Sequence, residues 1–155
     1  MTSASSPHQN RPLIQQLRAA ERVYVEAIRS ALADDGYEDL PPRGIVITMG
    51  LRREGSSVRD VSRRLGITSQ AVSQLVDTLV ARGYVQRSPD EVDRRRIVLS
   101  LTERGHGATT TTAAAISAID KQLTLSTTAD ERAALHHGLE ALIALGDSES
   151  AELDA

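Results

Sequence analysis

The sequence predicts a mainly α-helical fold with one small β-hairpin, and three observations lead to this class. Aromatic side chains are nearly absent, since the 155 residues include no Phe, no Trp and three Tyr. A core must therefore be built from Leu, Ile, Val and Ala, which favours helices packed closely on helices. Apolar residues also recur at intervals of three, four and seven along most of the chain. Finally, two short β-prone segments, 84–88 and 96–101, lie on either side of a polar loop.

The length predicts a single domain over residues 1–155. Cysteine is absent, which excludes disulfides, thiolate metal sites and cysteine-based redox sensing. The first dozen residues are polar, unlike an export signal, and no run approaches the ~18 apolar residues of a membrane-spanning helix. We therefore expect a cytoplasmic protein that has no membrane partner. Residues 1–10 and 147–155 are expected to form disordered tails.

Four helices are predicted outside the central region. The first begins at Leu13 and ends before Gly36, where glycine can take the left-handed conformation that ends a helix. Pro42 suits the first turn of the second, which is expected over about 42–54. Thr102 is expected to cap a long helix that follows the hairpin. The last helix is expected over 129–146.

The central region predicts two more helices, joined by a tight turn at Gly66. Thr68 is expected to cap the second of them, and Gly83 to end it. Such a pair is a helix-turn-helix, a weak signal alone because many helical hairpins share the pattern. The residues expected to face inward are Val58, Val61, Leu65, Val72, Leu75, Val76, Leu79 and Val80.

The hairpin that follows makes the interpretation more specific. Its polar loop, 89–95, has a basic tip, and Ile97, Leu99 and Leu101 alternate along the second strand, so we expect them on one face. A helix-turn-helix followed directly by a hairpin is a winged helix. We therefore predict a winged helix-turn-helix lobe over residues 41–101.

The charge is unevenly distributed along the chain. The net charge of −3 argues at first against a nucleic-acid partner. Residues 52–104, however, contain 11 Arg and seven acidic residues, which gives this segment +4 and leaves −7 for the rest. A locally positive lobe in an acidic protein is expected if only one face of the protein contacts the phosphates of a nucleic acid. The alternative is an Arg-rich surface that is merely solvated.

Residues 55–105 also carry a family resemblance, which covers about a third of the chain in detail. The features that carry it are Val58 to Leu65, Ile67-Thr68, Val72-Ser73, Val76-Asp77, Leu79, Gly83-Tyr84-Val85, Arg87, Asp93-Arg94-Arg95 and Leu101-Thr102-Glu103-Arg104-Gly105. The Asp-x-Arg wing followed by Thr-x-x-Gly is the more specific part. In these features the chain resembles the MarR (multiple antibiotic resistance regulator) family.

The resemblance implies a transcriptional regulator, typically a repressor, that binds double-stranded DNA at a pseudo-palindromic operator. It also implies an obligate homodimer and, often, release from DNA by a small-molecule effector. Residues 12–40 would then be an N-terminal dimerisation helix with its linker, and residues 102–146 the C-terminal dimerisation helices. Two lobes must lie about 34–36 Å apart to reach successive major grooves.

If Thr68 caps the second helix of the motif, the face opposite its apolar stripe carries hydroxyl and carboxamide groups. Gln can bond adenine in a bidentate manner, which discriminates by about 1–3 kcal/mol, and a helix N-terminus offers free N–H groups to phosphate. An ordinary polar helix face is the alternative. The predicted DNA contacts of this helix are Thr68, Ser69, Gln70, Ser73 and Gln74.

The wing is expected to bind DNA differently. By resemblance Arg95 enters the minor groove, where an Arg reads width and potential, and Arg94 lies on the backbone. Asp93 would orient the tip, through a hydrogen bond to Arg87 among others. The alternative for that pair is a surface ion pair worth under ~1 kcal/mol. The preceding helix carries two further arginines, Arg63 and Arg64. We expect them either to contact phosphate or to be solvated charges.

The terminal helices and the region between helices and lobe supply further candidates. The dimer-interface candidates, for which an intramolecular core is the alternative, are Leu13, Ile14, Leu17, Leu139, Leu142 and Ile143. By resemblance, an effector pocket could include Arg18, Tyr24, Tyr37, Ile45 and Met49. With so few aromatic residues, an aliphatic cleft suits this chain better than a stacking pocket.

No cofactor, metal or catalytic site is predicted. The four His are scattered, and His136 and His137 point about 100° apart on a helix, so they do not form a ligand pair. No Gly-rich phosphate loop follows a strand, and no Ser/His/Asp set or paired carboxylates can be recognised, so we predict no enzyme. The competing hypothesis is a winged-helix module that has lost DNA binding and interacts with proteins.

Overall fold

The computed structural model describes residues 11–51, 57–90, 93–95 and 97–153, apart from the side chains of residues 64–65 and 147–153. The chain divides into two compact units, Met1–Ile116 and Ser117–Ala155. The division has a physical reason, because none of the described side chains in 117–146 is buried. The buried core belongs to the first unit.

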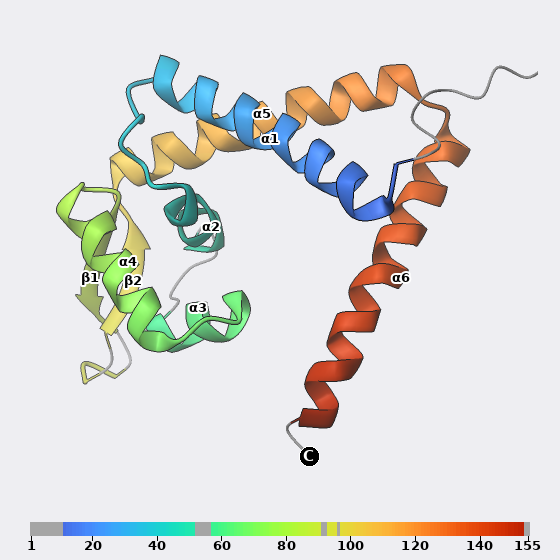
Figure 1. Ribbon diagram of the computed structural model, residues 1–155. Coiled ribbons are helices and arrows are strands. Elements are labelled where there is room, and N and C mark those ends of the chain that lie inside the picture. Colours follow the sequence, from blue (N-terminus) through green and yellow to red (C-terminus); the bar gives the residue numbers. More distant parts are fainter. Residues whose placement is uncertain (1–10, 52–56, 91–92, 96, 154–155) are drawn as a thin grey trace, which may run out of the picture. The chain divides into compact units, whose positions relative to one another are not determined.

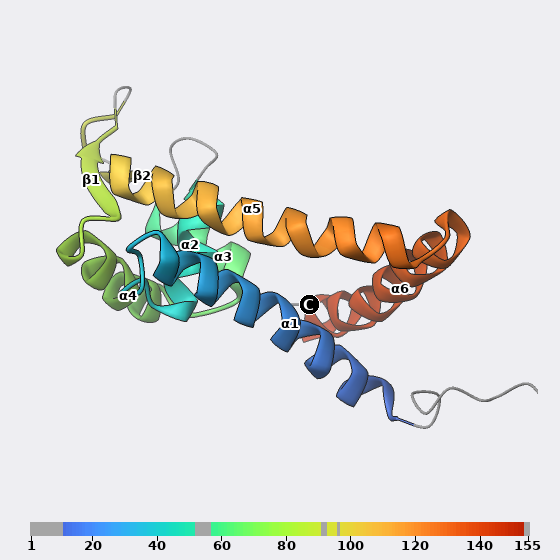
Figure 2. The same ribbon diagram turned by 90° about the horizontal axis from the view of Figure 1, so that it is seen from above.

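The described chain contains helices and a single two-stranded sheet, so the predicted fold class is confirmed (Figure 1). The elements in order are α1 (Leu13–Asp34), α2 (Pro42–Leu51), α3 (Val58–Leu65), α4 (Ser69–Ala81), β1 (Val85–Pro89), β2 (Ile97–Leu101), α5 (Glu103–Ser126) and α6 (Ala129–Leu153). Figures 1 and 2 show α2, α3 and α4 gathered beside the β1–β2 hairpin. None of the helices within the described ranges is both long and apolar enough to cross a membrane.

The turn between α3 and α4 forms where the sequence predicted it. Ser57 caps α3 in a reciprocal arrangement with Asp60, whose carboxylate accepts from the Ser57 backbone N–H at 2.9 Å. Gly66 ends the helix with φ +61°, a left-handed conformation that costs glycine little. The second helix, α4, ends before Gly83, which has φ +72°.

The wing is an antiparallel hairpin in which Val85 pairs with Leu101, Arg87 with Leu99, and Pro89 with Ile97. Ile97, Leu99 and Leu101 alternate along β2, which places them on one face of the strand as expected. Leu99 and Leu101 are buried on that face, whereas the side chain of Ile97 is 49% exposed. This residue lies at the outer end of β2, beyond the part of the strand that packs on the core.

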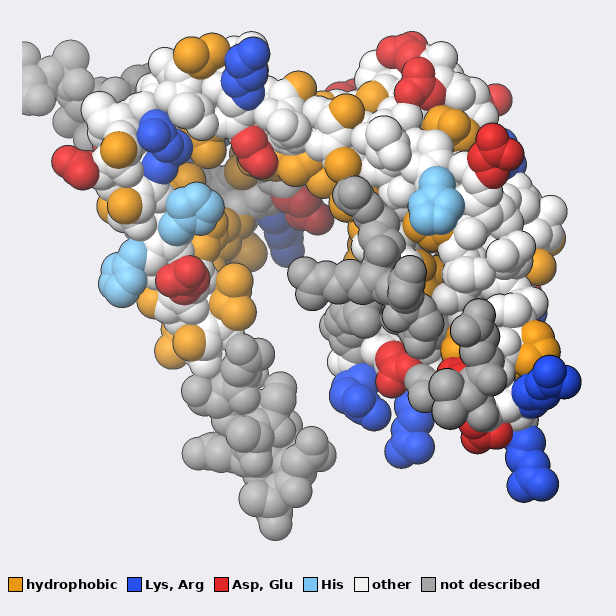
Figure 3. Space-filling model, turned by 180° about the vertical axis from the view of Figure 1, so that it is seen from behind, with side chains coloured by type: hydrophobic (Ala, Val, Ile, Leu, Met, Phe, Trp, Pro, Cys, Tyr) orange, Lys and Arg blue, Asp and Glu red, His pale blue; other side chains and the backbone are white. Residues whose placement is uncertain are grey.

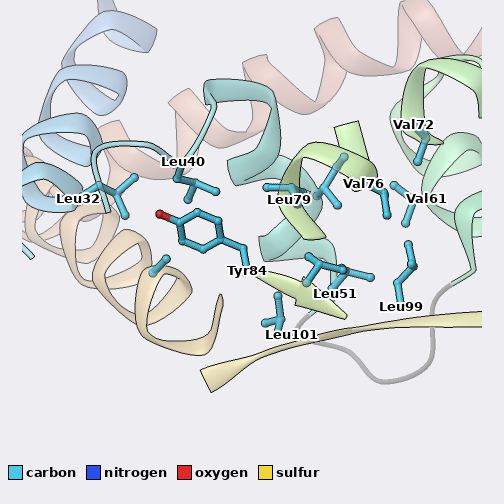
Figure 4. Packing of buried hydrophobic residues seen from close by; sticks show 13 residues of the cluster. Leu32, Leu40, Leu51, Val61, Val72, Val76, Leu79, Tyr84, Leu99 and Leu101 are labelled. Atoms are coloured by element: carbon cyan, nitrogen blue, oxygen red, sulfur yellow. The ribbon is translucent and has the colours of Figure 1, made fainter. Parts of the chain in front are cut away.

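The core of the first unit is aliphatic apart from one tyrosine. Figure 4 shows Tyr84 beside Leu40 and Leu101, with its hydroxyl directed away from Leu79. The buried hydrophobic residues are Leu32, Leu40, Ile47, Leu51, Val61, Val72, Val76, Leu79, Tyr84, Val85, Leu99, Leu101 and Ala108. Of the predicted inward residues, Val58, Leu75 and Val80 are partly buried against this cluster. The side chain of Leu65 lies outside the described residues.

The start of α5 packs tightly because two of its residues lack a side chain. A Cβ at Gly105 would collide with the backbone carbonyl of Tyr84, and a Cβ at Gly107 would collide with the hydroxyl of Tyr37. The rings of these two tyrosines lie 6.3 Å apart in a tilted arrangement. The first turns of α5 therefore hold both aromatic residues in place.

The C-terminal end of α6 differs from the expectation. α6 begins with a capping box between Thr128 and Glu131. It continues to Leu153, over residues that we expected to be a tail, because Gly146 does not take a positive φ and no proline follows it. α2 ends at Leu51, and the rest of its expected span lies outside the described residues.

Candidate nucleic-acid interface

The predicted cap of α4 is present. The Thr68 hydroxyl accepts a hydrogen bond of 3.2 Å from the backbone N–H of Ala71, and its carbonyl accepts one of 3.0 Å from Val72. Thr68 has an extended backbone conformation, as expected of an N-cap. The other first-turn N–H groups remain directed out of the helix end, where the helix dipole favours an anion.

α4 has one buried face and one open face. Val72, Val76 and Leu79 have no exposed surface. On the other side, the candidate contacts Ser69, Gln70 and Gln74 are exposed. Ser73 is only half-buried, which places it at the edge of the open face. The helix thus presents polar groups at its N-terminal end and anchors itself through the apolar stripe.

Ser62 is a structural residue of this motif that sequence reasoning missed. Its hydroxyl donates to the backbone carbonyl of Ile67 at 2.6 Å, and the Ser69 hydroxyl lies 3.4 Å from it. These bonds tie the end of α3 to the start of α4 and so help to set the angle of the motif. A hydroxyl residue in the last turn before Gly66 was the available signal.

The tip of the wing is organised by short-range hydrogen bonds to Asp93. Its carboxylate accepts from the backbone N–H of Arg95 at 3.0 Å, and its own N–H donates to the Asp90 carboxylate at 3.2 Å. Arg94 and Arg95 are both exposed. The two guanidinium groups are therefore exposed on a turn whose backbone is fixed by the hydrogen bonds of Asp93.

Arg87 does not bond Asp93, and the sequence interpretation of that pair needs correction. Its guanidinium forms an ion pair of 2.8 Å with Asp77 on α4. β1 contacts α4, so the carboxylate within reach of Arg87 comes from that helix. With side chains 38% and 64% exposed, the pair contributes less than about 1 kcal/mol, but it connects the wing to the helix.

Further cations surround this surface. Arg59 and Arg63 on α3 are exposed, and the side chain of Arg64 lies outside the described residues. Figure 3 shows Lys and Arg side chains projecting from one end of this lobe. The open face of α4, the two wing arginines and the exposed arginines of α3 are called the polar face below.

Two of the effector-pocket candidates, Tyr37 and Ile45, line one cavity of about 180 Å³. Arg18, Tyr24 and Met49 are not among its lining residues. The complete lining is Arg29, Leu32, Ala33, Tyr37, Glu38, Leu40, Pro42 and Ile45. The cavity is therefore mainly aliphatic, with one cation and one carboxylate.

The dimer-interface candidates are mostly exposed within their own units. In the first unit Leu13 and Ile14 are exposed and Leu17 is half-buried; in the second, Ile143 is 64% exposed. Leu142 is also exposed, and Leu139 is half-buried. Exposed leucine and isoleucine side chains do not belong to an intramolecular core. Within the residues described, no three His, Asp or Glu side chains gather as metal ligands would.

Comparison with known proteins gives consistent results. Residues 49–96, which include the polar end of α4 and the wing arginines, match the model of the MarR family. The HTH-type transcriptional regulator TtmR of Methylorubrum extorquens is 34% identical over 89 residues, which are 57% of this chain and 45% of that protein. The uncharacterized HTH-type transcriptional regulator YfiV of Bacillus subtilis is 31% identical over 86 residues, which are 52% and 54%. The chain thus spans about half the length of these curated relatives.

Solved structures resemble the fold over a larger share. FabT of Streptococcus pneumoniae in complex with DNA has a TM-score of 0.75 at 20% identity, covering 87% of this chain and 94% of that one. A mutant MarR from E. coli, complexed with operator DNA, has a TM-score of 0.67 at 21% identity, covering 84% and 93%. At such identities the likeness establishes the winged-helix fold.

Proposed function

From the match of residues 49–96 to the MarR family model, we propose that this chain is a MarR-family transcriptional regulator that binds double-stranded DNA sequence-specifically. The observation that carries the proposal is the polar end of α4. There a capped N-terminus, with exposed Ser69, Gln70 and Gln74, lies on a helix whose other face is fully buried. A helix held in this way can enter a major groove without giving up its core contacts.

In this proposal α4 reads bases and its N-terminus binds phosphate. Gln70 and Gln74 have the carboxamide that pairs with adenine N6 and N7, and each good contact of this kind discriminates by about 1–3 kcal/mol. Ser69 and the free N–H groups after Thr68 suit a phosphate. Ser73 lies at the edge of the open face and has a shorter side chain than the two glutamines, so its hydroxyl contacts only a base that comes close to the helix.

The wing supplies contacts of a different kind. Arg95 enters the minor groove beside the major groove that α4 occupies, and Arg94 contacts the backbone. The support is that both side chains are exposed on a turn held by Asp93. An Arg in a narrow minor groove responds to groove width and potential, and therefore favours A·T-rich DNA.

We further propose a homodimer on a pseudo-palindromic operator. Exposed apolar side chains on α1 and α6, such as Ile14 and Ile143, are supported as interface residues because water is a poor environment for them. A two-fold pair of lobes about 34–36 Å apart reads two half-sites one helical turn apart. Bound across a promoter, such a dimer acts as a repressor.

Release by a small-molecule effector completes the proposal. The cavity lined by Tyr37 and Ile45 could hold a small, largely aliphatic molecule. Such a molecule would release DNA only if it bound more tightly to a conformation whose lobe spacing does not match the operator. The guanidinium of Arg29 provides its polar contact.

A fluorescence-anisotropy titration of the chain with DNA from its own promoter tests DNA binding. We expect saturable binding whose logarithmic affinity falls linearly with the logarithm of salt concentration. Absence of binding at low salt, or binding without salt dependence, would contradict the proposal. Affinity unchanged by Arg94→Ala together with Arg95→Ala would favour the alternative, a winged helix that interacts with proteins.

A further inference from the structure

A polar cluster around Asp39 joins separate segments of the first unit at the base of the wing. The Asp39 carboxylate accepts a hydrogen bond of 2.5 Å from the Tyr84 hydroxyl and one of 2.8 Å from the Arg104 guanidinium. The Arg82 guanidinium donates to the backbone carbonyl of Asp39. Arg104 also donates to the carbonyl of Arg82 at 2.6 Å. These four residues are called the Asp39 cluster below.

The Asp39 cluster connects residues that are distant in sequence. Asp39 lies in the linker between α1 and α2, and Arg82 is the C-cap of α4. Tyr84 directly precedes β1, and Arg104 lies in the first turn of α5, just after β2. The Asp39 carboxylate therefore holds the bases of both wing strands to the linker. The backbone carbonyl of the same residue binds Arg82 at the end of α4.

The cluster is more than a surface ion pair because Tyr84 is fully buried. Figure 4 shows its hydroxyl directed toward the side of Leu32 and Leu40. The Arg104 guanidinium carbon lies 4.3 Å from the centre of its ring. The Asp39 carboxylate is thus the charged acceptor of a hydroxyl that has no access to water. A neutral amide at position 39 would accept this hydrogen bond more weakly, because bonds to ionised groups are the stronger ones.

Both acids of the cluster are held in the protonation state that this bond requires. Burial, and next the hydrogen bond to Asp39, raise the pKa of the Tyr84 phenol above its usual value. The same hydrogen bond from Tyr84, opposed by desolvation and assisted by Arg104, lowers the pKa of the Asp39 carboxyl. At neutral pH a phenol therefore donates to a carboxylate.

The Asp39 cluster lies far from the groups proposed to touch DNA. Arg82 follows Gln70 by twelve residues, which corresponds to about 18 Å along a helix. Apart from the repulsion between its charge and DNA, Asp39 can consequently affect DNA binding only through the placement of α4 and the wing. An effect of Asp39 on DNA binding would therefore be an indirect one, unlike the direct contacts proposed for the polar face.

Resting on the proposed function, we propose that Asp39 is a positioning residue for DNA binding. It fixes the C-terminal end of α4 and both bases of the wing to the α1–α2 linker, so that the major-groove and minor-groove elements meet DNA in one arrangement. Tyr84 and Arg104 transmit this restraint. Without the carboxylate, α4 and the wing would sample arrangements that do not fit both grooves at once.

The sign of the expected effect distinguishes positioning from charge. Removing an acidic residue weakens the repulsion of DNA and should tighten binding or leave it unchanged. A positioning role gives the opposite result. Glu38→Gln is the matched control, because it removes the same charge from the neighbouring exposed residue without removing an acceptor of Tyr84 or Arg104.

The experiment compares Asp39→Asn with Glu38→Gln by anisotropy with promoter DNA over a range of salt concentrations. We expect Asp39→Asn to bind about five- to tenfold more weakly than Glu38→Gln, an effect typical of residues that influence a ligand without touching it. The salt slope should stay unchanged, because no phosphate contact is lost. If Asp39→Asn binds as tightly as Glu38→Gln, the proposal is wrong.

Amide hydrogen exchange without DNA provides an independent measurement. The Tyr84 N–H donates to Leu79 at 2.9 Å, and the Thr102 N–H donates to Tyr84 at 3.1 Å. Both should exchange faster in Asp39→Asn than in Glu38→Gln, whereas the amide of Val76 in the middle of α4 should not. Equal acceleration at Val76 would indicate general destabilisation and would overturn the positioning role.

A Tyr84→Phe background completes the test. There, Asp39→Asn should weaken DNA binding less than in the unmodified chain, because the charge-assisted hydrogen bond of the Tyr84 hydroxyl is already gone. A full effect would contradict transmission through Tyr84. If the unmodified chain binds no promoter DNA, the proposed function fails. The exchange rates of the Tyr84 and Thr102 amides still show in that case whether Asp39 restrains the bases of the two wing strands.

Discussion

The two ends of α4 are held in opposite ways. At the N-terminal end, Ser69, Gln70 and Gln74 are exposed. The hydrogen bonds there are local, from the cap by Thr68 and between the hydroxyls of Ser69 and Ser62. At the C-terminal end Leu79 has no exposed surface, and the Asp39 cluster adds hydrogen bonds to two other segments. The N-terminal end, proposed to bind DNA, must stay open to its partner, so in this proposal the precision of its placement comes from the opposite end of the helix.

The largest expected difference between the ends is in stability. Leu79→Ala should lower the free energy of unfolding by about 2–5 kcal/mol, because it leaves a cavity in a fully packed site. Urea denaturation would measure the change. Val46→Ala, at a site 52% exposed, is the control and should cost much less. Equal losses at the two sites would contradict the assignment of the core.

The reading end should show its effect in DNA recognition instead. Gln70→Ala should leave stability nearly unchanged and should cost about 1–3 kcal/mol of preference at one base pair. Anisotropy with a set of operators that carry single substitutions would locate that base pair. Arg94→Ala, by contrast, should weaken binding to all of them and lower the salt slope by about 1. A uniform loss from Gln70→Ala would show that this side chain does not read a base.

The anchoring end should also respond to acid. Because the pKa of Asp39 is lowered in the folded protein, its contribution is present above the ordinary aspartate value of 3.8 and is lost as pH falls through the folded pKa. The stability difference between the unmodified chain and Asp39→Asn should therefore shrink below that pH. Urea denaturation at pH 7, 4 and 3 would show it. A difference that grows in acid would contradict the charged pair.

The smallest effect is expected between the two ends, at the pair of Arg87 and Asp77. Asp77→Asn should change stability by less than about 1 kcal/mol, because both partners are exposed. Differential scanning calorimetry in low and high salt would measure it, with the small difference vanishing in high salt. A salt-independent loss would indicate that Asp77 has a role beyond this pair.

Features set by neighbours three or four residues apart could be predicted from the sequence. The cap at Thr68 and the stops at Gly66 and Gly83 follow from local backbone hydrogen bonding and from the conformational freedom of glycine. The buried stripe of α4 follows from helical spacing. These local rules placed the polar end of the candidate interface before any tertiary contact was known.

Choices of distant partners could not be predicted in the same way. Arg87 bonds Asp77 rather than Asp93, since the approach of β1 to α4 decides which carboxylate is within reach. Asp39 and Tyr84, 45 positions apart, carry no local pattern that would relate them. The exposure of Ile97 depends on where the packed part of the hairpin ends, which alternation alone does not reveal.

The glycines at the start of α5 have a consequence for how related sequences can change. Glycine weakens a helix by about 1 kcal/mol relative to alanine, yet a Cβ at Gly107 would collide with the Tyr37 hydroxyl. With phenylalanine at position 37 the severe collision disappears, and the nearest atom to an alanine Cβ is then the ring carbon Cζ at 3.1 Å, a contact that a small shift of the ring relieves. Positions 37 and 107 should therefore covary among homologues, whereas Gly105, which faces the backbone of Tyr84, has no such compensating partner and should stay invariant.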